Sequence, residues 1–87
     1  MAKYISKNKP NLKHKPHWAN YWAQDEDGTC DWYENMPHCI ECDKGQGVWI
    51  PVDGRTQSAS KMPIDAMGWA YSLVKIDGET LTVMRTI

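Results

Sequence analysis

The chain has 87 residues and a formal net charge of −1, and a domain of this size buries only about 60% of the surface that its unfolded chain exposes. Phenylalanine is absent, so five tryptophans and four tyrosines must supply the large apolar side chains of a core. The sequence shows neither the apolar segment of a secretion signal nor a run near the ~18 apolar residues of a membrane helix. We therefore expect one small cytoplasmic domain without a membrane partner.

The charged residues are segregated along the chain. Residues 1–24 hold five lysines and no acid, whereas residues 25–43 hold seven acids and no lysine or arginine. Blocks of like charge create a local field that can steer a charged partner toward the protein. The alternative is that both blocks are simply solvated faces, as most charge runs are.

Residues 1–16 mix lysine and asparagine with two prolines and show neither strand alternation nor helical periodicity. We predict a basic N-terminal arm here, followed by a single β-rich domain over residues 17–87. The lysine spacing is compatible with contacts to nucleic-acid phosphates. Such arms are more often only mobile.

Residues 17–37 place two aromatic-rich runs on either side of an acidic turn, which predicts a β-hairpin. Asp27-Gly28 favours a two-residue type I′ turn, because both central positions of that turn need positive φ. Pairing across such a turn sets Trp22 opposite Tyr33 and places both, with Trp18, on one face. That aromatic face is either core or a surface kept for a partner.

The second half of the chain predicts further strands. Residues 48–52 form a short edge strand, because Pro51 has no N–H for a ladder. After a turn at residues 53–54, the polar segment 55–63 favours a loop. Residues 62–76 fit a helix or a strand, and we favour one helical turn near 63–67 and then a strand.

A last hairpin is predicted over residues 69–86 with its turn at Asp77-Gly78, which sets Val74 opposite Leu81. With this hairpin, the chain contains three Asp-Gly turns. The predicted fold is mainly β, a small antiparallel meander or barrel of four to six strands with at most one short helical turn.

The cysteines and histidines suggest a metal site. An odd number of cysteines favours reduced thiols or metal ligands over a disulfide framework. Cys39 and Cys42 form one C-x-x-C, and His17 and His38 meet at the open end of the predicted hairpin, so the four could bind zinc. Cys30 is roughly 26 Å away along an extended strand and cannot join them. The alternative is that the thiols are unliganded and that no cofactor is bound.

Acidic residues crowd the predicted turn beyond what its geometry needs. A two-residue turn requires only Asp27-Gly28, so the neighbouring acids repel one another without a structural reason. Charge and aromatic anchors together are typical of a compact protein interface, here one that faces a partner with a basic groove. The predicted partner-binding residues are Asp25, Glu26, Asp27, Asp31, Trp18, Trp22 and Tyr33.

No catalytic signature is present, which predicts a protein without enzymatic activity. Residues 25–31 lack the ligands that would complete an EF-hand calcium loop. The glycines at 45 and 47 are not followed by the helix and Lys-Thr of a phosphate-binding loop. The serines lie in no nucleophile elbow.

Two blocks of the chain resemble a group of small bacteriophage proteins. The blocks run from Trp18 to Gly28 and from Trp32 to Pro37, and they follow the pattern W-A-x-x-x-A-x-D-x-D-G-x-x-x-W-Y-E-x-x-P. The resemblance implies a phage origin and an accessory role during infection, and it supplies no catalytic residues.

The leading hypothesis is therefore a phage-encoded binding protein that inhibits a bacterial defence system or host enzyme in the host cytoplasm. It would act through the acidic, aromatic-rich hairpin. One alternative is a nucleic-acid-binding module that uses the lysine-rich arm and a zinc knuckle. The other is a minor structural phage protein.

Overall fold

Strands dominate the computed structural model, which describes residues 7–40, 48–65 and 68–84. Its strands are β1 (Tyr21–Gln24), β2 (Cys30–Tyr33), β3 (His38–Ile40), β4 (Val48–Ile50), β5 (Thr56–Ser58), β6 (Val74–Asp77) and β7 (Thr80–Val83). Five of them form one sheet in the order β5-β2-β1-β6-β7, and β3 pairs with β4 in a second sheet. The mainly β, antiparallel prediction is confirmed, with a large sheet that stays open at β5 and β7 rather than closing into a barrel.

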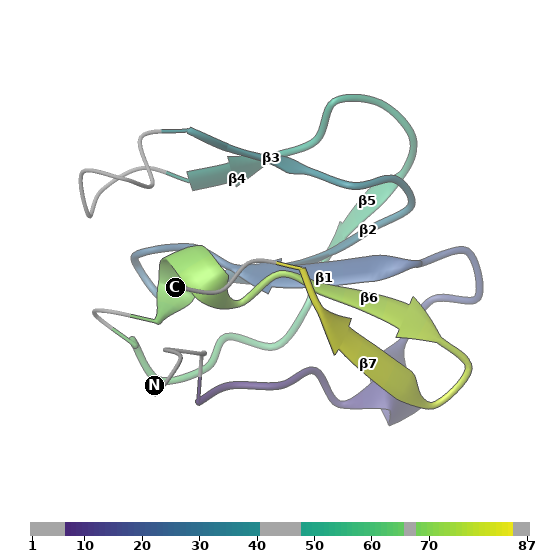
Figure 1. Ribbon diagram of the computed structural model, residues 1–87, viewed down its shortest axis with the longest axis horizontal. Coiled ribbons are helices and arrows are strands. Elements are labelled where there is room, and N and C mark those ends of the chain that lie inside the picture. The colour runs from purple at the N-terminus through teal and green to yellow at the C-terminus, as the bar shows by residue number, and fades with distance from the viewer. Residues whose placement is uncertain (1–6, 41–47, 66–67, 85–87) are drawn as a thin grey trace.

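The large sheet lies between two covering layers (Figure 1). On one face, Ala23 and Tyr33 pack against Trp49 of β4 and Trp69 of the 3-10 helix η3 (Trp69–Tyr71). The other face carries a second cluster, which contains Trp22 and Trp32. Its cover comes from the N-terminal segment, including the 3-10 helix η1 (Leu12–His14), and from the segment after β5. Both faces of the sheet are therefore buried.

Four tryptophan side chains are buried in this core. Trp22 is 0% exposed, Trp32 2%, Trp49 5% and Trp69 1%. The indole N–H of Trp49 donates to the carbonyl of Trp69 at 3.2 Å. Large aromatic side chains thus allow a chain without phenylalanine to cover its sheet on both sides.

The β1–β2 hairpin forms where it was predicted, but its register differs by one residue. Trp22 pairs with Trp32, and Tyr21 pairs with Tyr33. A shift of one residue moves side chains to the opposite face. The predicted aromatic face is therefore wrong, because Trp22 and Tyr33 lie on opposite sides of the sheet.

The turn explains this shift. The N–H of Gly28 donates to the carbonyl of Asp25 at 3.0 Å, and the N–H of Asp25 donates to the carbonyl of Thr29 at 2.8 Å. Gly28 has φ of 94°. The connection is thus a three-residue loop that ends in a left-handed glycine, rather than the two-residue type I′ turn expected from Asp-Gly.

The C-terminal hairpin also turns one residue later than predicted. Gly78 and Glu79 form its two-residue turn, so Val74 pairs with Val83 instead of Leu81. This displacement is two residues, an even number, so each side chain keeps the face that was predicted for it.

Two other local predictions were wrong. The predicted strand from residue 69 begins only at Val74, because residues 69–71 form η3. The helical turn predicted near residues 63–67 falls partly on residues 66 and 67, which lie outside the described residues. The polar segment after Gly54 contains β5, which pairs with β2. Pairing with β2 thus overrides the weak strand propensity of β5.

A buried polar network joins four segments at Gln24, which is 0% exposed. Its amide nitrogen donates to the carbonyl of Pro63 at 3.0 Å and to that of Gly28 at 3.3 Å, and its amide oxygen accepts from Asn8 at 2.8 Å. Its backbone N–H donates to the Ser72 hydroxyl at 2.7 Å. Among the described residues, no buried side-chain nitrogen or oxygen lacks a hydrogen-bond partner.

We expect Trp22→Ala to lower the free energy of unfolding by about 3–5 kcal/mol, because it empties the centre of a buried cluster. Ile64→Ala removes a side chain that is 63% exposed and should cost less than about 1 kcal/mol. Urea unfolding of both variants measures the difference. Equal losses in the two variants would contradict the burial of Trp22.

Candidate functional site

The acidic turn keeps two carboxylates at the surface, those of Glu26 and Asp27. The carboxylate of Asp27 accepts from the N–H of Thr29 at 2.9 Å and also from the Thr29 hydroxyl. These bonds lower the pKa of Asp27. Asp27 therefore shapes the turn while its charge remains accessible.

Asp25 has a structural role that the sequence did not reveal. Its carboxylate accepts from the backbone N–H of Trp49 at 2.9 Å, and the Tyr33 hydroxyl donates to the carbonyl of Trp49 at 3.3 Å. The N–H and C=O of one strand residue point to the same edge. Asp25 and Tyr33 therefore close the outer edge of β4, and the expectation that Asp25 lacks a structural reason is wrong.

Burial shifts the titration of the acids beneath the turn. It raises the pKa of Asp25 to about 6, against the lowering effect of the Trp49 N–H, and the charges of Asp31 and Asp27 add to the rise. Burial likewise raises the pKa of Asp31, although a hydrogen bond with Ser58 opposes this. These two acids therefore belong to the fold more than to the surface.

The predicted aromatic partner residues are divided by the sheet. Trp22 and Tyr33 are buried on opposite faces, so neither offers a surface to a partner. Trp18 is partly exposed, and the guanidinium of Arg55 lies 5.1 Å from its ring centroid. Arg55 also forms an ion pair with Glu34 at 3.0 Å. Trp18 is thus covered by a charged side chain that already has a partner.

The predicted zinc ligands do not form a site in the described structure. His17 lies beside Trp18, in the layer that covers one face of the large sheet, whereas His38 lies in β3 over the other face. Cys39 is disulfide-bonded, so its sulfur is not the thiolate that zinc requires. Cys42 lies outside the described residues. Within the described ranges, no three His, Cys, Asp or Glu side chains converge.

The disulfide contradicts the expectation of reduced thiols or metal ligands rather than disulfides. Of the two cysteines in the described ranges, Cys39 is disulfide-bonded and Cys30 is a free thiol. Cys30 is 1% exposed. Burial raises its pKa to about 11, which keeps the thiol protonated and unreactive near neutral pH.

The main surface feature missed by the sequence analysis is the outer face of β3–β4. Cys39 and Trp49 point inward, so the alternate residues point to solvent. Ile40 is 45% exposed, Val48 42% and Ile50 38%. β3 is only three residues long, which is too short for an alternating pattern to be recognised in the sequence.

The acidic turn lies beside this apolar face, because Asp25 bonds directly to β4 between Val48 and Ile50. We call the combined region the hairpin surface. It consists of Glu26, Asp27, Ile40, Val48 and Ile50. Glu26 and Asp27 are the exposed carboxylates of the loop that Asp25 joins to β4, and the nearby charge of Lys61 contributes to the lowered pKa of Asp27.

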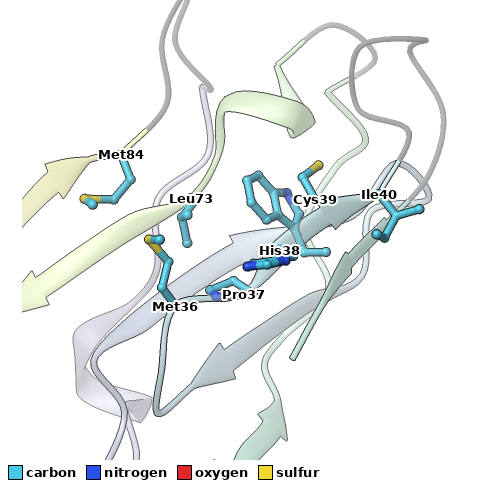
Figure 2. Close-up of a pocket in the computed structure, with 8 residues that line it drawn as sticks. Met36, Pro37, His38, Cys39, Ile40, Leu73 and Met84 are labelled. Carbon is cyan, nitrogen blue, oxygen red and sulfur yellow. The ribbon is translucent and has the colours of Figure 1, made fainter. Parts of the chain in front are cut away.

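A pocket of about 340 Å³ lies along β3, on the side of β6 and β7 (Figure 2). Trp49 and Leu73 line it and are buried, whereas Met36 and Met84 are 46% and 40% exposed. Figure 2 shows the two methionines at one end of the pocket and Ile40 at the other. Ile40 thus belongs to both the pocket and the hairpin surface.

Comparisons with protein-family models, with curated proteins and with solved structures found no match to this chain. The bacteriophage resemblance therefore stays a prediction. No helix among the described residues is long and apolar enough to cross a membrane.

Asp25 should make stability depend on pH. Its folded pKa of about 6 lies above the ordinary 3.8, so its contribution to stability is complete below about pH 3.8 and is lost as the pH rises through about 6. Asp25→Asn retains an acceptor for the Trp49 N–H without this titration. We expect a flatter stability curve for Asp25→Asn than for the wild type across that range, measured by urea unfolding.

The acceptor can be tested separately from the charge. Asp25→Ala and Asp25→Asn both remove the charge, but only the alanine leaves the Trp49 N–H without its acceptor. We expect Asp25→Ala to be less stable than Asp25→Asn by about 1–3 kcal/mol at pH 7. Equal stabilities would show that the hydrogen bond does not hold β4 in place.

Proposed function

We propose that the protein acts by binding another protein through the hairpin surface. The observation that supports this proposal is the contact between the acidic turn and β4, which joins the loop that carries two exposed carboxylates to the strand that carries the exposed Val48 and Ile50. Contiguous apolar side chains with a polar rim are typical of protein interaction sites. The alternation of the strands directs these side chains to solvent, but neither the alternation nor the closure of β4 requires them to be apolar.

The charge on this surface suggests the chemistry of the partner. Carboxylates at the rim of an interface attract basic partners and speed their association, whereas the apolar centre supplies most of the binding free energy. A partner with lysine or arginine beside an apolar patch fits both features. The proposed partner is still a basic protein, as predicted from the sequence. The apolar part of its binding site, however, is the outer face of β3–β4 and not the predicted aromatic face.

We further propose that the partner is a bacterial host protein, a defence component or an enzyme, which is inhibited during phage infection in the host cytoplasm. The phage-like blocks support this proposal, since the block from Trp18 to Gly28 contains β1 and the acidic turn. Inhibition by occupying a basic groove requires no catalytic group.

A second candidate is nucleic-acid binding by the N-terminal layer. Lys7, Lys9 and Lys13 are exposed there, on the other side of the large sheet from β3–β4. Phosphate contacts would weaken steeply with salt. The zinc knuckle that was predicted for this candidate is left out of the proposal, because Cys39 is disulfide-bonded.

Capture from bacterial lysate by the tagged protein tests the first proposal. Glu26→Lys with Asp27→Asn reverses the surface charge but retains an acceptor at position 27 for Thr29. Glu79→Lys with Asp77→Asn makes the same charge change at the exposed β6–β7 turn and serves as the control. We expect the first variant to capture at least about tenfold less of the protein retained by the wild type, most clearly at low salt.

The control variant should capture as much as the wild type does. Equal capture by both variants, with unchanged melting temperatures, would show that the acidic turn is only a solvated loop. Capture that requires nucleic acid and is lost on Lys9→Glu would favour the second candidate.

A further inference from the structure

The pocket beside β3 has the size and lining of a site for one large side chain. A cavity of about 150 Å³ lined by aliphatic and aromatic residues can hold a benzene molecule, and this pocket has about 340 Å³. Its buried residues, Trp49 and Leu73, are already dry and packed. The pocket is open toward solvent, and its volume is large enough to hold an indole or phenol ring.

The two methionines favour an aromatic occupant over an aliphatic one. Met36 and Met84 stand at the same end of the pocket, and each is close to half exposed. Thioethers make favourable contacts with aromatic rings, and their flexible side chains adapt to the shape of an incoming group. A ring that enters between them would bury apolar surface that is exposed to water in the free protein.

The position of the acidic turn relative to the pocket indicates which residues accompany the aromatic side chain in the partner. The pocket lies along β3, whereas the acidic turn contacts the outer edge of β4. Neighbouring strands lie about 4.8 Å apart, so the path from β3 across β4 to the acidic turn is roughly 10 Å, and an extended chain advances ~3.3 Å per residue. A segment with its ring in the pocket therefore reaches the acidic turn after about three residues.

We propose that this pocket is the anchor site of the hairpin surface and takes an aromatic side chain from a basic segment of the partner. The inference rests on the proposed function, because it names the chemistry that the same surface recognises. The anchor would pack against Trp49 and Leu73, while lysine or arginine residues about three positions away meet Glu26 and Asp27. A buried aromatic group at the centre of an interface commonly dominates its affinity.

A short peptide tests the pocket without the natural partner. The probe is an acetylated peptide with one tryptophan, two serines and then two lysines, added to protein with ¹³C-labelled methionine methyl groups. We expect saturable ring-current shifts at the methyl groups of Met36 and Met84. Met62 packs on the opposite face of the large sheet and is the internal control, which should not shift.

Matched peptides and variants separate the contributions. Replacement of the peptide tryptophan by leucine or alanine should weaken binding about tenfold or more. Replacement of its lysines by glutamates should also weaken binding, most clearly at low salt. The double variant Met36→Ala, Met84→Ala should lose about tenfold in affinity for the tryptophan peptide and capture correspondingly less host protein. Ile64→Ala should change neither.

Several outcomes would overturn the proposal. Methyl groups of Met36 and Met84 that do not move at millimolar peptide would show that the pocket takes no ring. Equal affinity for the leucine and tryptophan peptides would exclude an aromatic anchor. Peptide binding combined with undiminished capture by the double variant would refute the anchor and leave the proposed function intact. A wild-type protein that captures nothing would refute the proposed function, while the peptide titration still decides what the pocket binds.

Discussion

The fold depends on the buried amide of Gln24. One fully enclosed side chain bonds to the N-terminal segment through Asn8, to the acidic turn through Gly28 and to the segment before η3 through Pro63. The backbone of the same residue is held by Ser72, which follows η3. A buried polar network of this kind is costly unless every member is satisfied. It is satisfied only when all four segments close over the ends of β1 and β2, so it favours a single arrangement of the covering layers.

The position of Gln24 also links the core to the surface. Asp25 follows it directly, and the Asp25 carboxylate holds β4 by its Trp49 N–H, while Glu26 and Asp27, the next two residues of the turn, stay exposed. The acids of the turn thus divide into those that serve the fold and those that remain exposed. Trp49 also serves both the fold and the candidate site. Its backbone is bound by Asp25, and its indole packs in the core and borders the pocket. A rigid, preformed surface of this kind loses little conformational entropy on binding.

The sequence predicted the fold class because alternating aromatic runs and Asp-Gly turns are local signals. It failed in register, since Gly28 with positive φ suits both a two-residue and a three-residue loop, and only the pairing of Asp25 with Thr29 distinguishes them. The role of Asp25 was not predictable, because its partner Trp49 lies 24 residues away. β3 and β5 are three-residue strands whose pairing comes from their neighbours rather than from their own propensity. The acidic half of the hairpin surface was visible in the sequence, but its apolar half required the structure.

Hydrogen exchange of the protein, alone and in complex with the host protein that it captures, tests most directly whether the hairpin surface is the binding site. Backbone amides exchange more slowly where a partner covers them or stabilises the element that carries them. If the hairpin surface is the binding site, exchange slows in β3, in β4 and in residues 25–29 of the complex, with no change at the turn between β6 and β7. Slower exchange confined to the N-terminal layer or to β5, with β3 and β4 unchanged, would show that the partner binds elsewhere.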